Sequence, residues 1–212
     1  GGGGLGMGSG YDIPTVEWME AHAHGVARLA ALCPEAGLVP IVEPEVLMTG
    51  GHTLERSLAV TNEVLHAVFD QLYKQKILLE GMILKPNMIL PGLDCIVQDP
   101  IYAIAETTVK CLLRIVPAAI PGIAFLSGGQ SAELASSRLD AMNDKFKSEL
   151  PWALTFSFGR ALQQPALAVW NGNDANIHEA QMALYRRAKF NRAACMGNYS
   201  GMMEKAVEYQ SD

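Results

Sequence analysis

Basic residues are scarce in this 212-residue sequence, and they do not cluster. The 16 lysines and arginines are outnumbered by 22 acidic residues, which gives a formal net charge of −6. Because nucleic acids and anionic membranes attract patches of Lys and Arg, this balance excludes both as electrostatic partners. Charged residues of either sign make up 18% of the chain and hydrophobic ones 50%, so the composition also excludes disorder for most of its length.

Cysteine and histidine are few, and they are not arranged as metal ligands. The four cysteines, Cys33, Cys95, Cys111 and Cys195, form no Cys-x-x-Cys pair, and the five histidines show no His-Glu-x-x-His spacing. Such wide separations are not those of a disulfide-rich secreted domain either. We therefore expect free buried thiols, no metal site and no other cofactor.

Long apolar runs are absent too. No stretch of about 18 apolar residues escapes interruption by a charge, Pro or Gly, and the N-terminus has no basic segment followed by an apolar one. Neither a membrane span nor a signal peptide is predicted, and a cytoplasmic protein is the default expectation. Residues 1–10 contain seven glycines and nothing that could anchor a core, so we expect a flexible tail or linker there and the folded part in residues 11–212.

Short apolar runs alternate with longer segments of helical period along the chain. Four runs have the composition of strands buried on both faces: residues 38–45, 81–87, 122–129 and 153–159. Helical segments separate and follow them: residues 14–33, 53–76, 99–116, a helix opened by Ser131, a short turn before Pro165, and residues 174–195. Asp99 is the expected N-cap of the third helix, with Pro100 at its first helical position. Four β-then-α units without a hairpin signal predict a parallel sheet.

The strand ends favour a closed barrel over an open sheet. Each strand ends in polar residues: Glu43 and Glu45, Lys85 and Asn87, Ser127 to Gly129, and Ser157 to Arg160. A (β/α)8 barrel builds its site from the carboxyl ends of many strands, whereas an open sheet concentrates its site at one switch point. A full barrel needs eight strands and roughly 250 residues. We therefore expect an α/β fold of the (β/α)8 TIM-barrel class, of which this chain supplies about the last four β/α units.

Three charged side chains at the first two strand ends could carry covalent chemistry. Lys85 follows an apolar strand, where desolvation favours a neutral amine that can attack a carbonyl and form a Schiff base. The plainer interpretation of such a lysine is a solvated strand cap. Glu43 and Glu45, two residues apart, are expected to face the same side. They could be a general acid and base, or a structural pair held by basic neighbours.

Glycine turns at the other two strand ends favour an anion site. SGGQS, residues 127–131, leads from a strand into a helix with two adjacent glycines, which can expose backbone N–H groups to a phosphate. SFGRAL, residues 157–162, repeats this arrangement and adds Arg160, whose guanidinium can bind phosphate. One such loop alone could be an ordinary turn. Two on the last strands of a barrel match the place where barrel enzymes frequently bind phosphate.

Four segments together resemble a known family: LVPIVEPEVL, EGMILKPNMILPG, FLSGGQS and PWALTFSFGRALQ. In this order and at these spacings they are similar to the class I fructose-1,6-bisphosphate aldolases, from about residue 14 to residue 200. The resemblance implies that Lys85 forms the Schiff base, that Glu43 donates and accepts protons, and that Glu45 organises the charge around them. It also implies a sugar-phosphate site made by Ser127, Gly128, Ser157, Gly159 and Arg160.

The resemblance further implies an activity and its setting. The activity is reversible cleavage of fructose 1,6-bisphosphate to dihydroxyacetone phosphate and glyceraldehyde 3-phosphate, in glycolysis and gluconeogenesis. The implied protein is a homotetramer without a metal. The family's aspartate on the first strand and basic groups on the third and fourth would precede residue 11, and the chain ends in Tyr209 to Asp212 rather than in a tyrosine. A different Schiff-base aldolase, an inactive barrel fragment and an interaction module therefore remain as alternatives.

Overall fold

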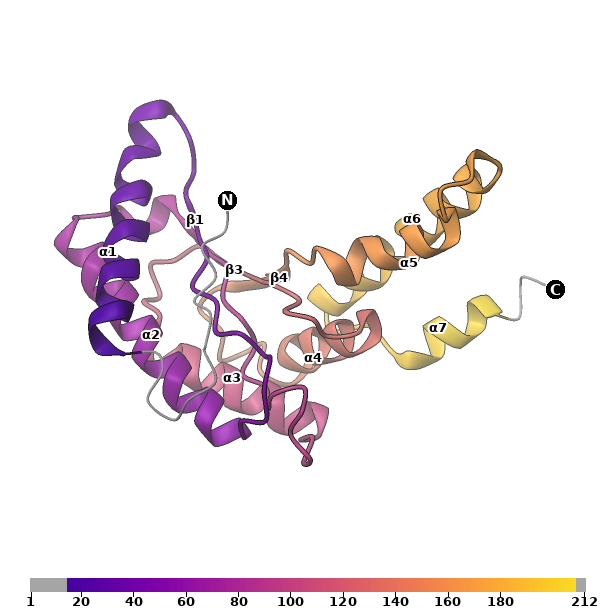
Figure 1. Ribbon diagram of the computed structural model, residues 1–212, viewed down its shortest axis with the longest axis horizontal. Helices are drawn as coiled ribbons and strands as arrows, with labels where there is room; N and C mark the ends of the chain where they lie inside the picture. The colour runs from indigo at the N-terminus through magenta and orange to yellow at the C-terminus, as the bar shows by residue number, and fades with distance from the viewer. Residues whose placement is uncertain (1–14, 209–212) are drawn as a thin grey trace.

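The computed structural model describes residues 15–208, in which parallel strands alternate with helices (Figure 1). The strands are β1 (Ile41–Val42), β2 (Ile83–Leu84), β3 (Gly122–Phe125) and β4 (Ala153–Phe156). The α-helices are α1 (Val16–Leu32), α2 (Leu54–Lys74), α3 (Ile101–Ile115), α4 (Ala132–Lys145), α5 (Arg160–Trp170), α6 (Ile177–Cys195) and α7 (Gly201–Glu208). Short 3-10 turns are η1 (Pro34–Ala36), η2 (Leu79–Gly81) and η3 (Asp174–Asn176). The glycine-rich tail predicted for residues 1–10 lies outside the described residues.

The strands form one parallel sheet in the order β1-β2-β3-β4. This confirms the predicted parallel arrangement, and the alternation of strands and helices is that of a partial (β/α)8 barrel of about four units. Because all the strand pairs are parallel, the four carboxyl ends lie along one edge of the sheet. The candidate site residues follow those ends.

The first two strands are shorter than predicted. β1 ends at Val42 and β2 at Leu84, and a proline follows each within two residues: Pro44 and Pro86. Proline has no N–H to continue a sheet ladder, which explains the early ends. A single bond still extends the pairing, because the backbone N–H of Lys85 donates to the carbonyl of Val42 at 2.7 Å. Glu43 and Glu45 therefore lie in the loop after β1, and the prediction that they share a strand is wrong.

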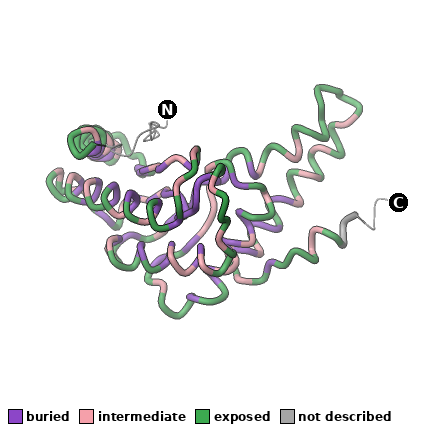
Figure 2. Tube along the Cα trace, turned by 60° about the horizontal axis from the view of Figure 1, so that its bottom comes forward, coloured by how far each residue is buried: buried purple, intermediate pink, exposed green. Residues whose placement is uncertain are grey.

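One face of the sheet is covered, and the other is more open. A row of opposed residues crosses all four strands and is almost fully buried: Val42, Leu84, Ile123 and Leu154. The preceding residue of β1, Ile41, points to the other face and remains 59% exposed. Figure 2 shows buried residues concentrated where the helices meet the strands. The helices thus pack on one side only, as they would on the outside of a barrel wall.

Hydroxyl side chains cap three of the helices, and of these only Ser131 was predicted to open its helix. Thr15, Thr53 and Ser131 each accept a backbone N–H bond as N-caps of α1, α2 and α4. The prediction for α3 is wrong: Pro100 is the N-cap, in an extended conformation, and the helix begins at Ile101. Asp99 is therefore one residue too early to cap α3.

The last helices form an arm. Helix α5 continues through Pro165 rather than breaking there, so the predicted short turn is wrong and the ring removes only one backbone donor. Helices α5 and α6 pack as an antiparallel pair that projects from the body in Figure 1, and most of its outer surface is exposed in Figure 2. Helix α6 begins at Ile177, after η3, close to the predicted start at residue 174.

Candidate functional site

The predicted site residues converge at the carboxyl edge of the sheet. The loops that carry them follow successive strands: Glu43 and Glu45 after β1, Lys85 after β2, Ser127 and Gly128 after β3, and Ser157, Gly159 and Arg160 after β4. Parallel strands put all these loops on one side. The structure therefore places every predicted position at one end of the sheet, with the side chains divided between two local environments.

Lys85 and Glu43 form the closest charged contact of this edge. The Nζ atom of Lys85 lies 3.0 Å from Oε1 of Glu43, and the two side chains are 21% and 30% exposed. Glu43 and Lys85 are the first residues after β1 and β2. The backbone hydrogen bond from Lys85 to Val42 therefore also fixes the position of the two residues relative to each other along the strands. A half-buried amine beside a carboxylate can exchange a proton without a large movement.

The pKa of Glu45 depends on burial and on three charged neighbours. Burial raises the pKa of the Glu45 carboxyl, and the negative charge of Glu43 raises it further. Arg160 and Lys85 act in the opposite direction on the same pKa. Glu43 therefore favours the protonated form of Glu45, and Arg160 of the last strand end lies within electrostatic reach of the first.

Asn87 holds the first two strand ends together, a role that sequence reasoning missed. The side chain is 3% exposed, and its Oδ1 accepts the backbone N–H of Val46 at 3.0 Å. Its Nδ2 donates to the carbonyl of Met88 at 3.1 Å and to Oγ1 of Thr61 on α2 at 3.4 Å. Asn87 therefore links the Glu45 loop to the Lys85 loop. The only signal in the sequence was a polar residue two positions after Lys85.

The loop after β3 contains two glycines in the left-handed region and is stabilised by buried hydrogen bonds. Gly128 and Gly129 have positive φ angles of 59° and 89°, which other residues rarely adopt. Gln130 is buried, and its Nε2 donates to the carbonyl of Ser127 at 3.0 Å. Its Oε1 accepts from Nη1 of Arg138 on α4 at 2.8 Å. Sequence reasoning missed this brace, because Arg138 has no local signal that distinguishes it from a surface arginine.

A cavity of about 380 Å³ opens between this loop and α5. Its walls include the segment from Gly129 to Ala132 and the first turns of α5, with Arg160, Ala161 and Gln164. The guanidinium of Arg160 lies over Gly129, since its Nη2 would be 3.8 Å from a Cβ placed there. The cavity has a cation, a helix N-terminus and a glycine turn at its border, which suits an anion.

The remaining predicted phosphate ligands do not line this cavity. Ser127 is buried, Ser157 is half-buried and donates its backbone N–H to the carbonyl of Phe125 at 2.8 Å, and Gly159 is the exposed N-cap of α5. Arg160 alone of the predicted set belongs to the cavity, together with Gly129, which neighbours Gly128. A larger cavity of about 450 Å³, between residues 51–55 and 94–99, involves none of them.

The cysteines are only partly as expected. All four are free, but Cys111 alone is buried, and burial raises its pKa to about 12. The other three are half-buried. Within residues 15–208, no three His, Cys, Asp or Glu side chains are grouped as metal ligands. In the same residues, no helix combines the length and apolar character needed to cross a membrane.

Comparison with known proteins gives one consistent family. The family model described as "Fructose-bisphosphate aldolase class-I" matches residues 9–212. The chain is 48% identical over 193 residues to a probable fructose-bisphosphate aldolase class 1 of Xylella fastidiosa, covering 91% of this chain and 57% of that one. It is also 48% identical over 192 residues to the cytosolic fructose-bisphosphate aldolase 6 of Arabidopsis thaliana, covering 91% of this chain and 53% of that one.

A solved structure agrees with the sequence matches. The fructose-bisphosphate aldolase of Plasmodium falciparum, in a ternary complex with TRAP and a small-molecule inhibitor, superposes with a TM-score of 0.85 at 45% identity. The match covers 89% of this chain and 54% of that chain. The chain thus spans about half the length of the relatives it matches.

Proposed function

This chain belongs to the class I fructose-bisphosphate aldolase family, and we propose that it cleaves fructose 1,6-bisphosphate through a Schiff base on Lys85. The products are dihydroxyacetone phosphate and glyceraldehyde 3-phosphate, and the reaction is reversible. The observation that carries the proposal is the contact of 3.0 Å between Nζ of Lys85 and Oε1 of Glu43 at adjoining strand ends.

Lys85 and Glu43 take the first step together. Transfer of a proton from Nζ to the carboxylate leaves a neutral amine, which attacks the C2 ketone of the sugar. Glu43 returns the proton to the departing oxygen, water leaves, and a protonated imine remains on Nζ. The imine then withdraws the electron pair of the neighbouring bond between C3 and C4.

During bond cleavage, Glu43 changes from proton donor to proton acceptor. Glu43 accepts the proton of the C4 hydroxyl as the C3–C4 bond breaks, which releases the aldehyde and leaves an enamine on Lys85. Protonation of C3 and addition of water to the imine release dihydroxyacetone phosphate and restore the amine. We propose that Glu45, whose pKa is raised by burial and by Glu43, takes part in these proton transfers.

The loops after β3 and β4 are proposed to hold the phosphate next to C1. Ser127, Gly128, Ser157 and Gly159 would offer hydroxyl and backbone donors, and Arg160 would supply the positive charge. The cavity supports the part of this assignment that concerns Arg160, because Arg160 and Gly129 line it. Binding there would keep the ketone close to Lys85, and correct placement of reacting groups can account for a large part of catalysis.

The wider setting is part of the proposal. We assign the chain to glycolysis and gluconeogenesis in the cytoplasm, as part of a homotetramer that needs no metal or other cofactor. The cytosolic relative and the similar aldolases support this setting. The imine withdraws electrons in place of a metal ion, so EDTA is expected to leave the reaction unchanged.

A single-turnover assay tests the proposal. The chain is held in excess over fructose 1,6-bisphosphate, and glyceraldehyde 3-phosphate is measured over hours. Release of triose phosphate is expected, with none from Lys85→Met. Equal release by Lys85→Met, or no release by the unchanged chain, would overturn the proposal.

A further inference from the structure

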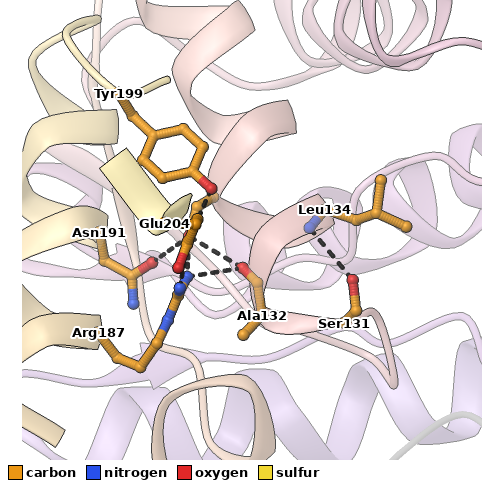
Figure 3. Close-up of polar contacts among 8 residues, drawn as sticks. Ser131, Ala132, Leu134, Arg187, Asn191, Tyr199 and Glu204 are labelled. Atoms are coloured by element: carbon orange, nitrogen blue, oxygen red, sulfur yellow. Dashed lines mark hydrogen bonds and ion pairs between the residues drawn. The ribbon is translucent and has the colours of Figure 1, made fainter. Parts of the chain in front are cut away.

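A buried arginine on α6 joins three helices. Arg187 is 5% exposed, and its Nη1 pairs with Glu204 of α7 (Figure 3). Its Nη2 donates to the carbonyl of Ala132 at 3.0 Å and to Oγ of Ser136 at 2.7 Å, both on α4. One guanidinium thus connects the last helix of the described chain to the first residue of α4.

Glu204 is the counter-ion of this group and has a second partner. The hydroxyl of Tyr199 donates to Oε1 of Glu204 at 2.8 Å. The backbone N–H of Tyr199 donates to Oδ1 of Asp140 on α4 at 2.7 Å, which fixes the chain just before α7. Figure 3 shows the Tyr199 ring and Arg187 converging on the Glu204 carboxylate. The position of α7 is therefore tied to α4 at two points.

Arg187 depends on that carboxylate. Its Nε atom is buried and has no hydrogen-bond partner among the described residues. A buried cation that loses its counter-ion is strongly unfavourable, so the guanidinium would have to move toward water if Glu204 left. Such a movement would break the bonds to Ala132 and Ser136.

Ala132 connects this cluster to the anion cavity. It is the first residue of α4, directly after the N-cap Ser131, and it lines the cavity with Gly129 and Arg160. The opposite side of the same residue, its carbonyl, is held by Arg187. The first residue of α4 thus binds Arg187 of α6 through its carbonyl and also lines the cavity.

We propose that Arg187 and Glu204 form a latch through which α7 sets the geometry of the anion cavity at the start of α4. This rests on the proposed function in one respect, that the ligand of the cavity is a phosphate group. Both are positioning residues, since neither lines the cavity. A docked α7 keeps the 127–132 segment in its binding geometry, and a released α7 weakens phosphate binding.

Glu204→Gln tests the latch with inorganic phosphate as the probe. The variant keeps the size of the side chain and removes its charge. Isothermal titration of the whole chain should give a dissociation constant about 3-fold to 10-fold higher than that of the unchanged chain, as expected for weakening a few hydrogen bonds. Glu179→Gln, an exposed change of the same charge in the first turn of α6, should leave the constant unchanged.

Two further variants separate positioning from general stability. Arg187→Lys keeps the charge but cannot reach Glu204, Ala132 and Ser136 at once, so it should weaken phosphate binding like Glu204→Gln. Val64→Ala removes buried volume from α2, which packs against α1 and α3. Val64→Ala should lower the melting temperature at least as much as Glu204→Gln does, and it should leave the affinity for phosphate unchanged.

Hydrogen exchange distinguishes failure of the latch from failure of the proposed function. Amides of residues 130–136 should exchange faster in Glu204→Gln than in Glu179→Gln, whether or not phosphate is present. Unchanged exchange and unchanged affinity in Glu204→Gln would overturn the latch while leaving the phosphate assignment intact. If exchange is faster in Glu204→Gln but the unchanged chain binds no phosphate, the link to the anion cavity and the phosphate assignment are both overturned.

Discussion

The two pairs of strand ends in this site differ in how their charges are balanced. After β1 and β2, Lys85 and Glu43 are half-buried and paired at 3.0 Å, with Glu45 beside them. After β3 and β4, the cavity is lined by Gly129, by the start of α4 and by the exposed Arg160 at the start of α5. The first region pairs opposite charges directly, whereas Arg160 in the second region makes no ion pair among the described residues, although its charge acts on the pKa of Glu45.

This difference corresponds to two chemical tasks. Proton transfer and imine formation need groups whose charges change during the reaction, and neighbouring opposite charges keep each state accessible. Binding a dianion needs fixed donors that stay unneutralised until the ligand arrives. We expect changes in the first region to act on the rate of the chemical step, and changes in the second to act on affinity.

The largest effect is expected from the groups that neither region supplies. The resemblance implies an aspartate and basic residues on earlier strands that the 212 residues do not include, so we expect the second phosphate and part of the proton relay to lack partners in this chain. Each missing positioned charge commonly costs about 10²-fold to 10³-fold. Steady-state turnover of the chain alone should therefore fall far below the usual range of about 1 to 10³ per second. A coupled assay giving turnover within that range would mean that the two regions suffice.

Replacing Glu43 should affect chemistry and leave binding almost unchanged. Glu43→Gln keeps a hydrogen-bonding group near Nζ of Lys85 but cannot accept its proton. Single-turnover cleavage should slow by about 10²-fold to 10⁴-fold, the usual contribution of a general acid or base. Binding of inorganic phosphate, measured by titration, should stay the same. A large loss of phosphate affinity in Glu43→Gln would contradict the assignment of chemistry to the first region and of binding to the second.

Arg160→Ala should produce the opposite pattern. A charge-assisted hydrogen bond to phosphate is worth about 1.5 to 3 kcal/mol, which converts to roughly 10-fold to 150-fold in affinity. The loss should appear for dihydroxyacetone phosphate and be absent for dihydroxyacetone. Gln163→Ala, an exposed change on the same helix outside the cavity lining, is the matched control. Equal losses for both ligands would make Arg160 a structural residue.

The smallest effect is on stability and concerns Glu45. Its pKa is raised in the folded chain, so the folded state binds the proton more tightly than the unfolded state and the ionised side chain destabilises the fold. Glu45→Gln should raise the melting temperature by about 1 to 3 °C at neutral pH. The gain should shrink as the pH falls and vanish below the ordinary value of 4.5. A gain that is independent of pH would contradict the assigned cause.

Local signals in the sequence were sufficient for most of the elements and for the position of the candidate site residues at the strand ends. Ser131 opens its helix as predicted, and the apolar runs mark the strands of the parallel sheet. Local chemistry also explains the errors. Pro44 and Pro86 end their strands early, and Pro100 adopts the extended N-cap conformation instead of the first helical position.

Contacts between distant segments were not predictable in this way. Asn87 binds a backbone group 41 residues away, and Arg187 binds a carbonyl 55 residues away. Neither residue has a neighbour in sequence that marks it, because its partners are brought close only by the packing of whole β/α units. The paired charges of the site, by contrast, follow strand ends whose alignment is a direct consequence of a parallel sheet.

Chemical trapping of the imine tests the central assignment most directly. The chain is incubated with dihydroxyacetone phosphate, reduced with borohydride and digested, and the modified peptide is mapped by mass spectrometry. The account predicts one label, on Lys85, which Lys85→Arg abolishes and Glu43→Gln slows. A label on another lysine such as Lys110 or Lys189, or no label at all on the unchanged chain, would contradict it.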